Sequence, residues 1–261
     1  MERRSFDVMG NIALVKFPEG TKQKEKEEFA KKITEKHKGV ETVVEKADKF
    51  KGRLRKMQTK HILGEKNKEV FYRENGCSFR FNIDECYFSP RLSNERKEIS
   101  SKIKKGDKVL VMFAGVGPFS IVIAKNSQPG KVVSNEINRQ ATSYAKQNVE
   151  LNKVQDKVDV VQGDIKKACS RLEEKYDKFD VIVMPRPQLK DSFLQHAFKL
   201  SKSGTKIIYY GFCDEGYREW IKDSIKEVAE KSGKKTRILK TKKAGEVAPY
   251  RLRLRVEFKV I

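Results

Sequence analysis

The chain has 261 residues, of which 38% are hydrophobic, and a formal net charge of +22. This length allows one large domain or one domain with a smaller companion. So basic a chain favours an acidic partner, most commonly nucleic acid, although a generally lysine-rich proteome is an alternative source of the charge. A membrane is disfavoured, because no basic helix carries a clean apolar face and no apolar run reaches the ~20 residues of a membrane span.

The cysteines and histidines give no sign of a metal site. The four cysteines, Cys77, Cys86, Cys169 and Cys213, are widely separated and form no C-x-x-C pair. We therefore expect neither a zinc site nor a disulfide framework, and a reducing cytoplasm fits best. The three histidines are scattered, and the first six residues lack the apolar core of a signal peptide.

Residues 1–82 are predicted to form a small α+β domain. A strand is expected over 11–17, and Thr21 can cap a helix that runs to about His37. A β-branched strand over 40–44 follows, and then a basic segment over 49–56. Two further strands, 70–73 and 77–82, flank an Asn75-Gly76 turn and predict a hairpin. The basic character favours RNA binding by this domain.

From residue 83 to 261, strands alternate with helices, which predicts a doubly wound, mainly parallel sheet. The expected strands are 108–113, 131–134, 157–161, 179–184, 205–210, 235–241 and 250–261, and the expected helices are 90–104, 118–125, 139–151, 189–200 and 216–231. The connection between the last two strands is too short for a parallel crossover, so that pair should be antiparallel. Seven strands that end in a reversed hairpin resemble the class I methyltransferase fold, which is Rossmann-like.

A glycine turn in the segment 109–120 predicts a ligand site. An apolar strand passes through Gly115 and Gly117 into an apolar helix start, where backbone comes close to a ligand. Ser120 stands where a dinucleotide fingerprint has its third glycine, so a nicotinamide or flavin site is disfavoured. The pattern G-x-G-x-F is similar instead to the first motif of the S-adenosylmethionine-dependent methyltransferases.

Two acids follow the next strands of the predicted sheet. Glu136 comes about twenty residues after the glycine turn and can accept both ribose hydroxyls of a nucleoside ligand. Asp164 follows the third strand and can face an adenine amino group. Either acid alone could be a solvated charge, but both together behind the glycine turn predict an adenosyl cofactor.

Several longer motifs are shared with one family. They are Asn75-Gly-Cys-Ser-Phe79, Tyr87-Phe-Ser-Pro-Arg-Leu-Ser-Asn-Glu-Arg96, Met112-Phe-Ala-Gly-Val-Gly-Pro-Phe119, Glu136-Ile-Asn138, Asn148-Val-Glu-Leu-Asn-Lys153 and Val256-Glu-Phe-Lys-Val260. From about Gly10 to its end, the chain resembles the archaeal and eukaryotic tRNA (guanine37-N1)-methyltransferases. Related enzymes on this scaffold act in wyosine synthesis at the same tRNA position, and one of them transfers an aminocarboxypropyl group.

The resemblance implies roles for individual residues. Glu95 matches the proposed general base for the guanine ring proton, with an intrahelical salt bridge as the alternative reading. Arg55, or else Arg53, would stabilise charge on the guanine oxygen. The implied cofactor-binding residues are Tyr87, Phe88, Arg91, Phe113, Gly115, Val116, Gly117, Glu136, Ile137, Asp164, Ile165 and Pro185. The implied substrate-binding residues are Arg53, Arg96, Arg186 and Pro187. For Tyr87 and Phe88, core packing is an equal alternative.

Three departures from the family pattern are visible. Val111 stands where the family has an acid, and Met184-Pro185-Arg186-Pro187 replaces an Asn-Leu-Pro type motif that positions the target base. The separate amino-terminal domain of many members is not recognised in this sequence.

The leading functional expectation is a monomeric cytoplasmic tRNA methyltransferase. It would use S-adenosylmethionine to methylate N1 of guanosine 37, with the base flipped from its stack. Carbon methylation of the tricyclic wyosine precursor, aminocarboxypropyl transfer to that precursor, and a silent RNA-binding module stay open as alternatives.

Overall fold

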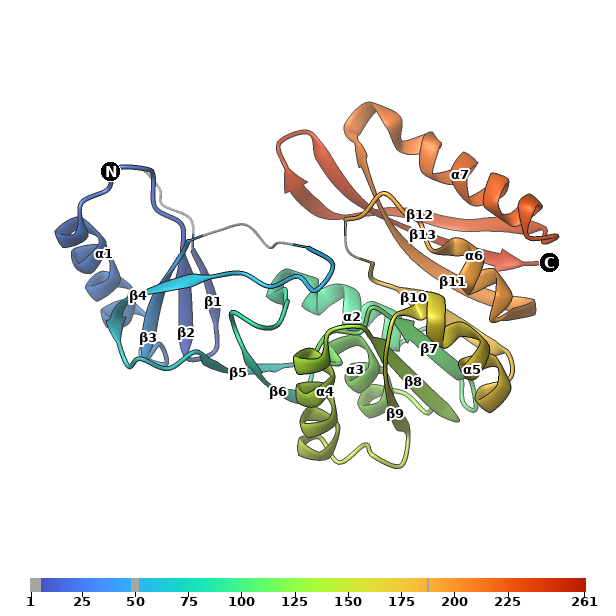
Figure 1. Ribbon diagram of the computed structural model, residues 1–261, viewed down its shortest axis with the longest axis horizontal. Coiled ribbons are helices and arrows are strands. Elements are labelled where there is room, and N and C mark those ends of the chain that lie inside the picture. Colours follow the sequence, from blue (N-terminus) through green and yellow to red (C-terminus); the bar gives the residue numbers. More distant parts are fainter. Residues whose placement is uncertain (1–5, 48–51, 187) are drawn as a thin grey trace.

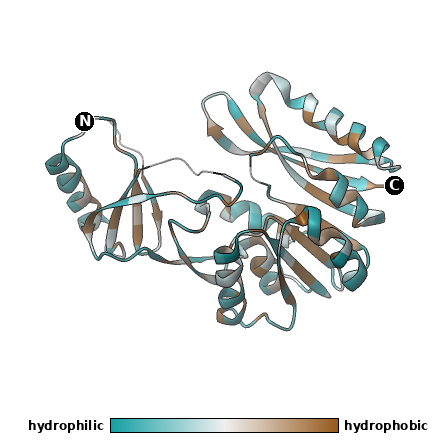
Figure 2. Cartoon of the chain, in the orientation of Figure 1, coloured by the Kyte–Doolittle hydropathy of each residue, from teal (hydrophilic) through white to brown (hydrophobic). Residues whose placement is uncertain are grey.

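The computed structural model describes residues 6–47, 52–186 and 188–261. A four-stranded sheet and a seven-stranded sheet each carry their own helices, and a two-stranded hairpin lies between them (Figure 1). This confirms the predicted class, a small α+β part followed by an α/β part. Hydrophobic residues concentrate on the strands, while the outer faces of the helices are mostly hydrophilic (Figure 2).

The amino-terminal sheet has the strand order β1-β2-β3-β4. Its elements are β1 (Phe6–Met9), β2 (Ile12–Val15), α1 (Gln23–Lys36), β3 (Thr42–Lys46) and β4 (Thr59–Gly64). Helix α1 connects the parallel pair β2 and β3, and its Ala30 and Ile33 share a core with Ala13, Val15 and Val43. The sequence analysis missed β1 and β4, because these edge strands bury only some of their side chains and show no clean alternation.

The hairpin of β5 (Glu69–Glu74) and β6 (Cys77–Asn82) was predicted, and asparagine side chains hold both of its edges. On the β5 edge, Asn11 Nδ2 donates to Glu69 O at 3.1 Å, and its Oδ1 accepts from Phe71 N at 2.9 Å. On the β6 edge, Asn148 in the helix Arg139–Leu151 and Asn152, which caps the end of that helix, each accept an N–H and donate to a C=O of the strand. The three amides thus replace the backbone of missing neighbour strands.

The hairpin therefore joins the two larger units. Its Val70, Phe79 and Phe81 belong to the same core as Val109 and Val111 of the large sheet. The predicted division of the chain at residue 82 stays a prediction. This shared core places the hairpin against the carboxyl-terminal part.

The large sheet has the order β12-β13-β11-β10-β7-β8-β9, which confirms the expected class I arrangement. Strand β13 runs antiparallel to both of its neighbours, whereas the other pairs are parallel. Its strands are β7 (Lys108–Met112), β8 (Lys131–Glu136), β9 (Val158–Gln162), β10 (Phe179–Met184), β11 (Ser201–Asp214), β12 (Thr236–Ala248) and β13 (Arg251–Val260).

Helices cover both faces of this sheet. One face carries the short turn η1 (Pro90–Leu92) with α2 (Ser93–Ser100), α3 (Pro118–Asn126) and α4 (Arg139–Leu151). The other face carries α5 (Ile165–Tyr176), α6 (Leu194–Lys199) and α7 (Arg218–Lys231), which follows the turn η2 (Glu215–Tyr217). Strand β7 contributes side chains to the cores on both faces. Val109 and Val111 point to the first face, and Leu110 and Met112 point to the second.

The structure of this part differs from the sequence prediction in three details. Helix α5 was missed, although Asp164 caps its start and an apolar stripe faces the core. Helix α6 begins at Leu194 rather than Leu189, since the preceding loop ends with Phe193 in a left-handed conformation (φ 57°). Strand β12 continues to Ala248 through several bulges, so only a two-residue turn separates it from β13.

Candidate active site

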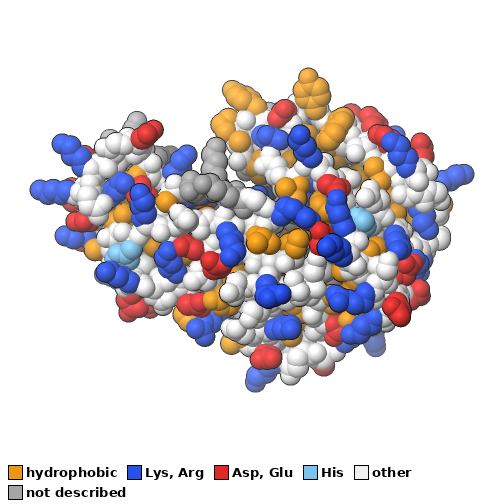
Figure 3. All heavy atoms as spheres, in the orientation of Figure 1, with side chains coloured by type: hydrophobic (Ala, Val, Ile, Leu, Met, Phe, Trp, Pro, Cys, Tyr) orange, Lys and Arg blue, Asp and Glu red, His pale blue; other side chains and the backbone are white. Residues whose placement is uncertain are grey.

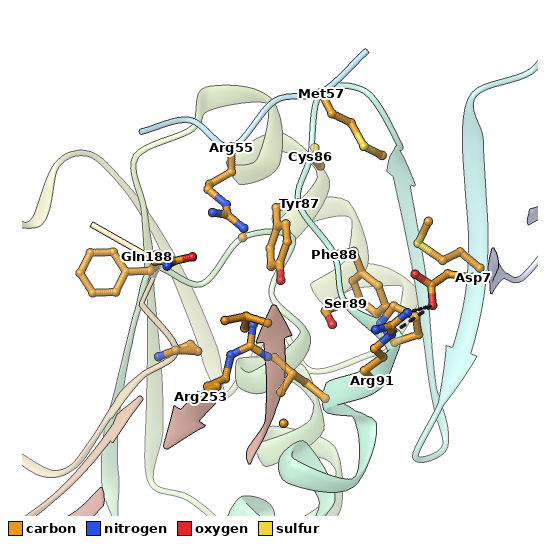
Figure 4. A pocket seen from close by; sticks show the side chains of 18 of the residues that line it. Asp7, Arg55, Met57, Cys86, Tyr87, Phe88, Ser89, Arg91, Gln188 and Arg253 are labelled. Atoms are coloured by element: carbon orange, nitrogen blue, oxygen red, sulfur yellow. Dashed lines mark hydrogen bonds and ion pairs between the residues drawn. The ribbon is translucent and has the colours of Figure 1, made fainter. Parts of the chain in front are cut away.

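A pocket of about 830 Å³ opens where the carboxyl ends of β7, β8 and β10 face the amino-terminal sheet. Open α/β sheets bind ligands at this edge. The segments that follow the strands contribute Phe113, Gly115, Glu136, Pro185 and Arg186, and the amino-terminal part contributes its own side chains from the opposite side. Figure 4 shows Arg55, Tyr87, Gln188 and Arg253 around the cavity, with Arg91 and Asp7 at one side.

Glu136 is anchored in the pocket by the glycine turn. Gly115 N donates to its Oε2 at 2.8 Å, and Asn138 N donates to its Oε1 at 2.7 Å. Burial raises the pKa of Glu136, and these backbone hydrogen bonds oppose that rise. Each oxygen keeps further acceptor capacity, so the carboxylate is placed to accept the two hydroxyls of a ribose. This carboxylate acceptor beside the glycine turn therefore fits the adenosyl cofactor expected from the sequence.

The glycines of the turn are needed for their backbone conformation. Gly115 has φ +58° and Gly117 has φ +87°, values that disfavour side chains with a Cβ. A Cβ on Gly117 would also lie 3.1 Å from Ile121 Cδ1. Val116 and Gly117 shape the turn but do not line the pocket in the described part of the chain, and neither does Ile137.

Asp164 lies just beyond the lining and holds a pocket residue in place. Arg53 Nη2 pairs with its Oδ2 at 2.7 Å, and Lys166 N donates to its Oδ1 at 3.1 Å. Burial raises the pKa of Asp164, but Arg53 and the Lys166 backbone outweigh it and hold that pKa below the usual value. Ile165 is buried at the start of α5 among apolar residues, which is core packing rather than a direct ligand contact.

Arg55 and Tyr87 form one wall of the pocket (Figure 4). The Arg55 guanidinium carbon lies 4.5 Å from the centre of the Tyr87 ring, within cation–π range. Phe88 stacks on Phe81 with ring centres 4.8 Å apart, so it combines core packing with a place in the lining.

Asn138 holds the two loops that carry Arg55 and Tyr87 in place. Asn138 Nδ2 donates to Leu54 O at 3.1 Å and to Glu85 O at 2.8 Å, while its Oδ1 caps helix α4. The family-like Glu136-Ile-Asn138 motif was read only for its acid. The asparagine of the motif was overlooked, although it positions the two loops that carry Arg55 and Tyr87.

Glu95 is buried behind the pocket rather than in its lining. The residue is 6% exposed, and its Oε2 accepts from Arg255 Nη1 at 2.7 Å and from the Tyr210 hydroxyl at 2.9 Å. Lys242 Nζ lies 3.3 Å from the other oxygen. These partners come from β11, β12 and β13, so the alternative of an intrahelical salt bridge is wrong for Glu95. Tyr210 does line the pocket and stands in contact with the carboxylate.

The two arginines of the Arg91-to-Arg96 block differ in position. Arg91 lines the pocket and pairs with Asp7 through Nη2 at 2.8 Å, which ties β1 to the site. Arg96 is only 1% exposed and is held by Glu74 and by Ser89 O. The guanidinium of Arg96 is thus paired inside the core, and the expected contact of Arg96 with substrate or phosphate stays a prediction.

The end of β10 reaches the pocket through Pro185 and Arg186. Arg186 Nη1 donates to Leu189 O and to Asp191 O, each at 3.0 Å, so this side chain braces the loop that follows. Pro187, predicted to bind substrate, lies outside the described residues.

Sequence reasoning missed the wall formed by β11 and the β12–β13 hairpin. Phe212 on β11 and Arg253 on β13 line the pocket together with residues 243–247 of β12. The Arg253 and Arg186 guanidinium carbons lie 5.5 and 5.7 Å from the centre of the Phe212 ring. The alternation Arg251, Arg253, Arg255 along one strand was the available signal.

The described residues contain neither a metal-binding cluster nor a membrane-spanning helix. No group of three or more histidine, cysteine, aspartate or glutamate side chains is arranged to hold a metal ion. No helix is long and apolar enough to cross a membrane.

Comparison with known proteins identifies relatives over nearly the whole chain. The TRM5/TYW2 methyltransferase domain matches residues 70–239, and the TYW2 N-terminal domain matches residues 2–67. The tRNA (guanine(37)-N(1))-methyltransferase Trm5b of Pyrococcus abyssi is 37% identical over 98% of this chain and 74% of its own length. The tRNA (guanine(37)-N(1))/4-demethylwyosine(37)-methyltransferase Taw22 of Nanoarchaeum equitans is 33% identical over 85% of this chain and 71% of its own length.

Solved structures agree with these sequence matches. The crystal structure of Pyrococcus abyssi Trm5b gives a TM-score of 0.86 at 36% identity, covering 98% of this chain and 74% of that one. A complex of aTrm5 with tRNALeu gives a TM-score of 0.84 at 28% identity, covering 98% of this chain and 72% of that one. From its motifs, its strand order and these matches, the chain belongs to the TRM5/TYW2 methyltransferase family.

Proposed function

We propose that this protein is a tRNA methyltransferase that transfers a methyl group from S-adenosylmethionine to N1 of guanosine 37. The observation that carries this proposal is Glu136, held by the glycine turn inside a pocket that arginines surround. A cavity of about 830 Å³ is near the upper end of typical small-molecule sites, which suits a cofactor and a flipped base together. The names of the relatives support guanosine 37 as the target.

S-adenosylmethionine would supply an electrophilic methyl group when bound. In this proposal Glu136 accepts the ribose hydroxyls, and Asp164 is the acid nearest the adenine side. Arg55 is positioned by its contact with Tyr87 to stabilise negative charge that develops on the guanine oxygen. Arg53 stays the alternative for that role, although its ion pair with Asp164 draws it toward the cofactor side.

The new N–C bond forms as the sulfur–methyl bond breaks, which would leave a neutral thioether. Guanine N1 loses its proton in the same step, and Glu95 is the carboxylate proposed to receive that proton. Because Glu95 lies behind Tyr210, we propose that the proton passes through the tyrosine hydroxyl. That oxygen would take the N1 proton while it gives its own proton to Glu95 Oε2, at 2.9 Å. Burial followed by the neighbouring Glu95 charge raises the pKa of Tyr210 well above its usual value, so the phenol is protonated at rest.

The test uses labelled S-adenosylmethionine and unmodified tRNA transcripts with G or A at position 37. Transfer only to the G37 transcript is expected. Failure to bind the cofactor would remove every enzymatic version and leave an RNA-binding module.

Glu98→Gln is the matched control for Glu95→Gln. Glu98 lies one turn further along α2 and also contacts Arg255 and Lys242, but the hydroxyl of the pocket residue Tyr210 donates to Glu95 and not to Glu98. We expect Glu95→Gln to lower turnover strongly with little change in cofactor affinity, Glu98→Gln to keep turnover, and Tyr210→Phe to slow transfer. Equal rates for the two glutamine variants would remove Glu95 from the chemistry.

A second candidate is carbon methylation of the tricyclic wyosine precursor. Pro185 or Met184 stands where the family has the asparagine that positions guanine, and Taw22 is named for both reactions. Transfer to tRNA from cells blocked at the tricyclic intermediate, with none to the G37 transcript, would favour this reaction. Aminocarboxypropyl transfer would be recognised by the mass of the product. We further propose that the protein acts as a monomer in the cytoplasm.

A further inference from the structure

Three large aromatic side chains at one corner of the protein are mostly exposed. Tyr250 is 79% exposed, Tyr217 is 69% exposed and Trp220 is 61% exposed. Burial of each ring would remove a large apolar area from water, so leaving all three in solvent forgoes that stabilisation. Packing in the hydrophobic core therefore does not explain why aromatic residues stand at these three positions.

These three rings come from two segments that the sheet brings together. Strand pairing places Asp214, the last residue of β11, opposite Arg251, the first residue of β13. The turn that contains Tyr250 therefore lies beside Tyr217 and the start of α7, with Trp220 three residues further on the helix. Figure 1 shows the hairpin tip and the beginning of α7 at the same end, and Figure 3 shows hydrophobic side chains gathered there.

The aromatic corner continues directly into the candidate active site. Moving inward from the turn, Val247 on β12, Phe212 on β11 and Arg253 on β13 line the pocket. A ligand segment attached to a base in the pocket would thus pass over this corner.

Two arginines of β13 lie close to the rings. In the part of the chain that the structure describes, neither Arg251 nor Arg253 takes part in an ion pair. With the Gln188 amide oriented so that its oxygen faces Arg251, the guanidinium donates to that oxygen at 2.9 and 3.0 Å, which leaves the charge of Arg251 in place. Guanidinium groups without an ion pair favour an anionic partner, and flat exposed rings favour a partner with planar faces.

We propose that Tyr217, Trp220 and Tyr250 form a stacking surface for unpaired RNA bases that neighbour the target base, with Arg251 and Arg253 contacting the RNA backbone. Single-stranded RNA combines both features, since its bases stack on aromatic side chains and its phosphates pair with arginine. This inference rests on the proposed function, because the surface borders the site proposed for a tRNA base.

Trp220 makes the surface directly observable, because it is the only tryptophan in the chain. The full protein is titrated with an RNA hairpin that carries an anticodon-type loop with G37, without cofactor, while tryptophan fluorescence is recorded. A blunt RNA duplex of equal length serves as the control for charge alone. We expect the loop RNA to quench and shift the emission, and the duplex to have much less effect.

Substitutions then test each ring through the dissociation constant for the same labelled hairpin. Tyr250→Ala and Trp220→Ala are each expected to weaken binding about tenfold, whereas Tyr250→Phe, which keeps the ring, should bind nearly as well as the parent. Leu151→Ala is the matched control, an exposed apolar side chain (54%) at the end of α4. Circular dichroism confirms that each variant is folded.

The outcomes separate the surface from the proposed reaction. Methyl transfer to the G37 transcript with no fluorescence change, or with unchanged affinity in both alanine variants, overturns the stacking surface and leaves the reaction standing. A response to loop RNA with tenfold losses in the variants, but no transfer to any tRNA, supports the surface and rejects the reaction. Equal quenching of tryptophan fluorescence by the loop RNA and by the duplex also overturns the stacking surface.

Discussion

Replacing Arg255 with methionine is expected to lower the free energy of unfolding by about 4 kcal/mol. Arg255 is fully buried, and its guanidinium meets Glu95 Oε2 at 2.7 Å and Glu257 Oε1 at 2.9 Å. It also contacts Glu98. The side chains of Glu95 and Glu257 are at most 8% exposed, so removal of the cation leaves two buried carboxylates close together without their main partner.

The magnitude follows from these contacts. Breaking one buried ion pair costs about 3–5 kcal/mol, because the remaining charge can neither be solvated nor paired. Two carboxylates are affected here, but Lys102 remains beside Glu257, and Lys242 remains near Glu95 at 3.3 Å. This partial compensation keeps the expected loss within the range for a single pair.

Urea unfolding followed by far-ultraviolet circular dichroism measures the loss. Lys231→Met is the control, since its pair with Glu227 is exposed on both sides and should contribute less than about 1 kcal/mol. The double variant Arg255→Met/Glu257→Met should recover part of the loss, because it removes one of the stranded charges. The reasoning is refuted if Arg255→Met costs under about 1 kcal/mol, or if the double variant is less stable than the single one.

Three further predictions concern the cofactor site and titration. Glu136→Gln should weaken cofactor binding at least about tenfold, because the amide nitrogen of glutamine cannot accept the second of the two backbone N–H groups. Calorimetry measures the affinity, with the exposed Glu150→Gln as control. Unchanged affinity would contradict the role of Glu136 in cofactor binding. Burial, followed by nearby carboxylates, raises the pKa of Cys86 to about 12, so this pocket thiol should resist iodoacetamide at pH 8 until the protein unfolds; rapid native labelling, located by mass spectrometry, would count against it. The hydrogen bond from Arg255 is the main cause that holds the pKa of Glu98 far below its usual value. Stability should therefore be lost as pH falls below about 4, where the unfolded Glu98 binds a proton that the native one does not, and urea unfolding at pH 5 and 3 should show a smaller loss in Glu98→Gln.

Local signals were enough to predict the large sheet. Strand β7, the glycine turn and Glu136 could be placed because a continuous apolar run followed by Gly115 and Gly117 has few other structural solutions. The edge strands β1 and β4 were missed, since only some of their residues are buried and the alternation is weak. Helix α5 was hidden by its many charged residues, although its apolar stripe has helical spacing.

The parts of the site that could be predicted are those formed by residues close together in the sequence. Gly115 and Glu136 lie close in sequence and meet where expected. The partners of Glu95 and Arg96 depend on tertiary pairing, as Arg255 lies 160 residues from Glu95 and Glu74 comes from the hairpin. No local pattern distinguishes an arginine that faces a pocket from one that is buried against an acid.

The asparagine contacts on the small hairpin also bear on solubility. A two-stranded sheet has two open edges, and each exposed row of N–H and C=O groups can recruit a strand from another molecule. Asn11 occupies two of these groups on β5, and Asn148 and Asn152 occupy four on β6. The same amides that join the two halves of the enzyme thus block intermolecular strand addition. Alanine at these positions should promote aggregation on heating in addition to any loss of stability.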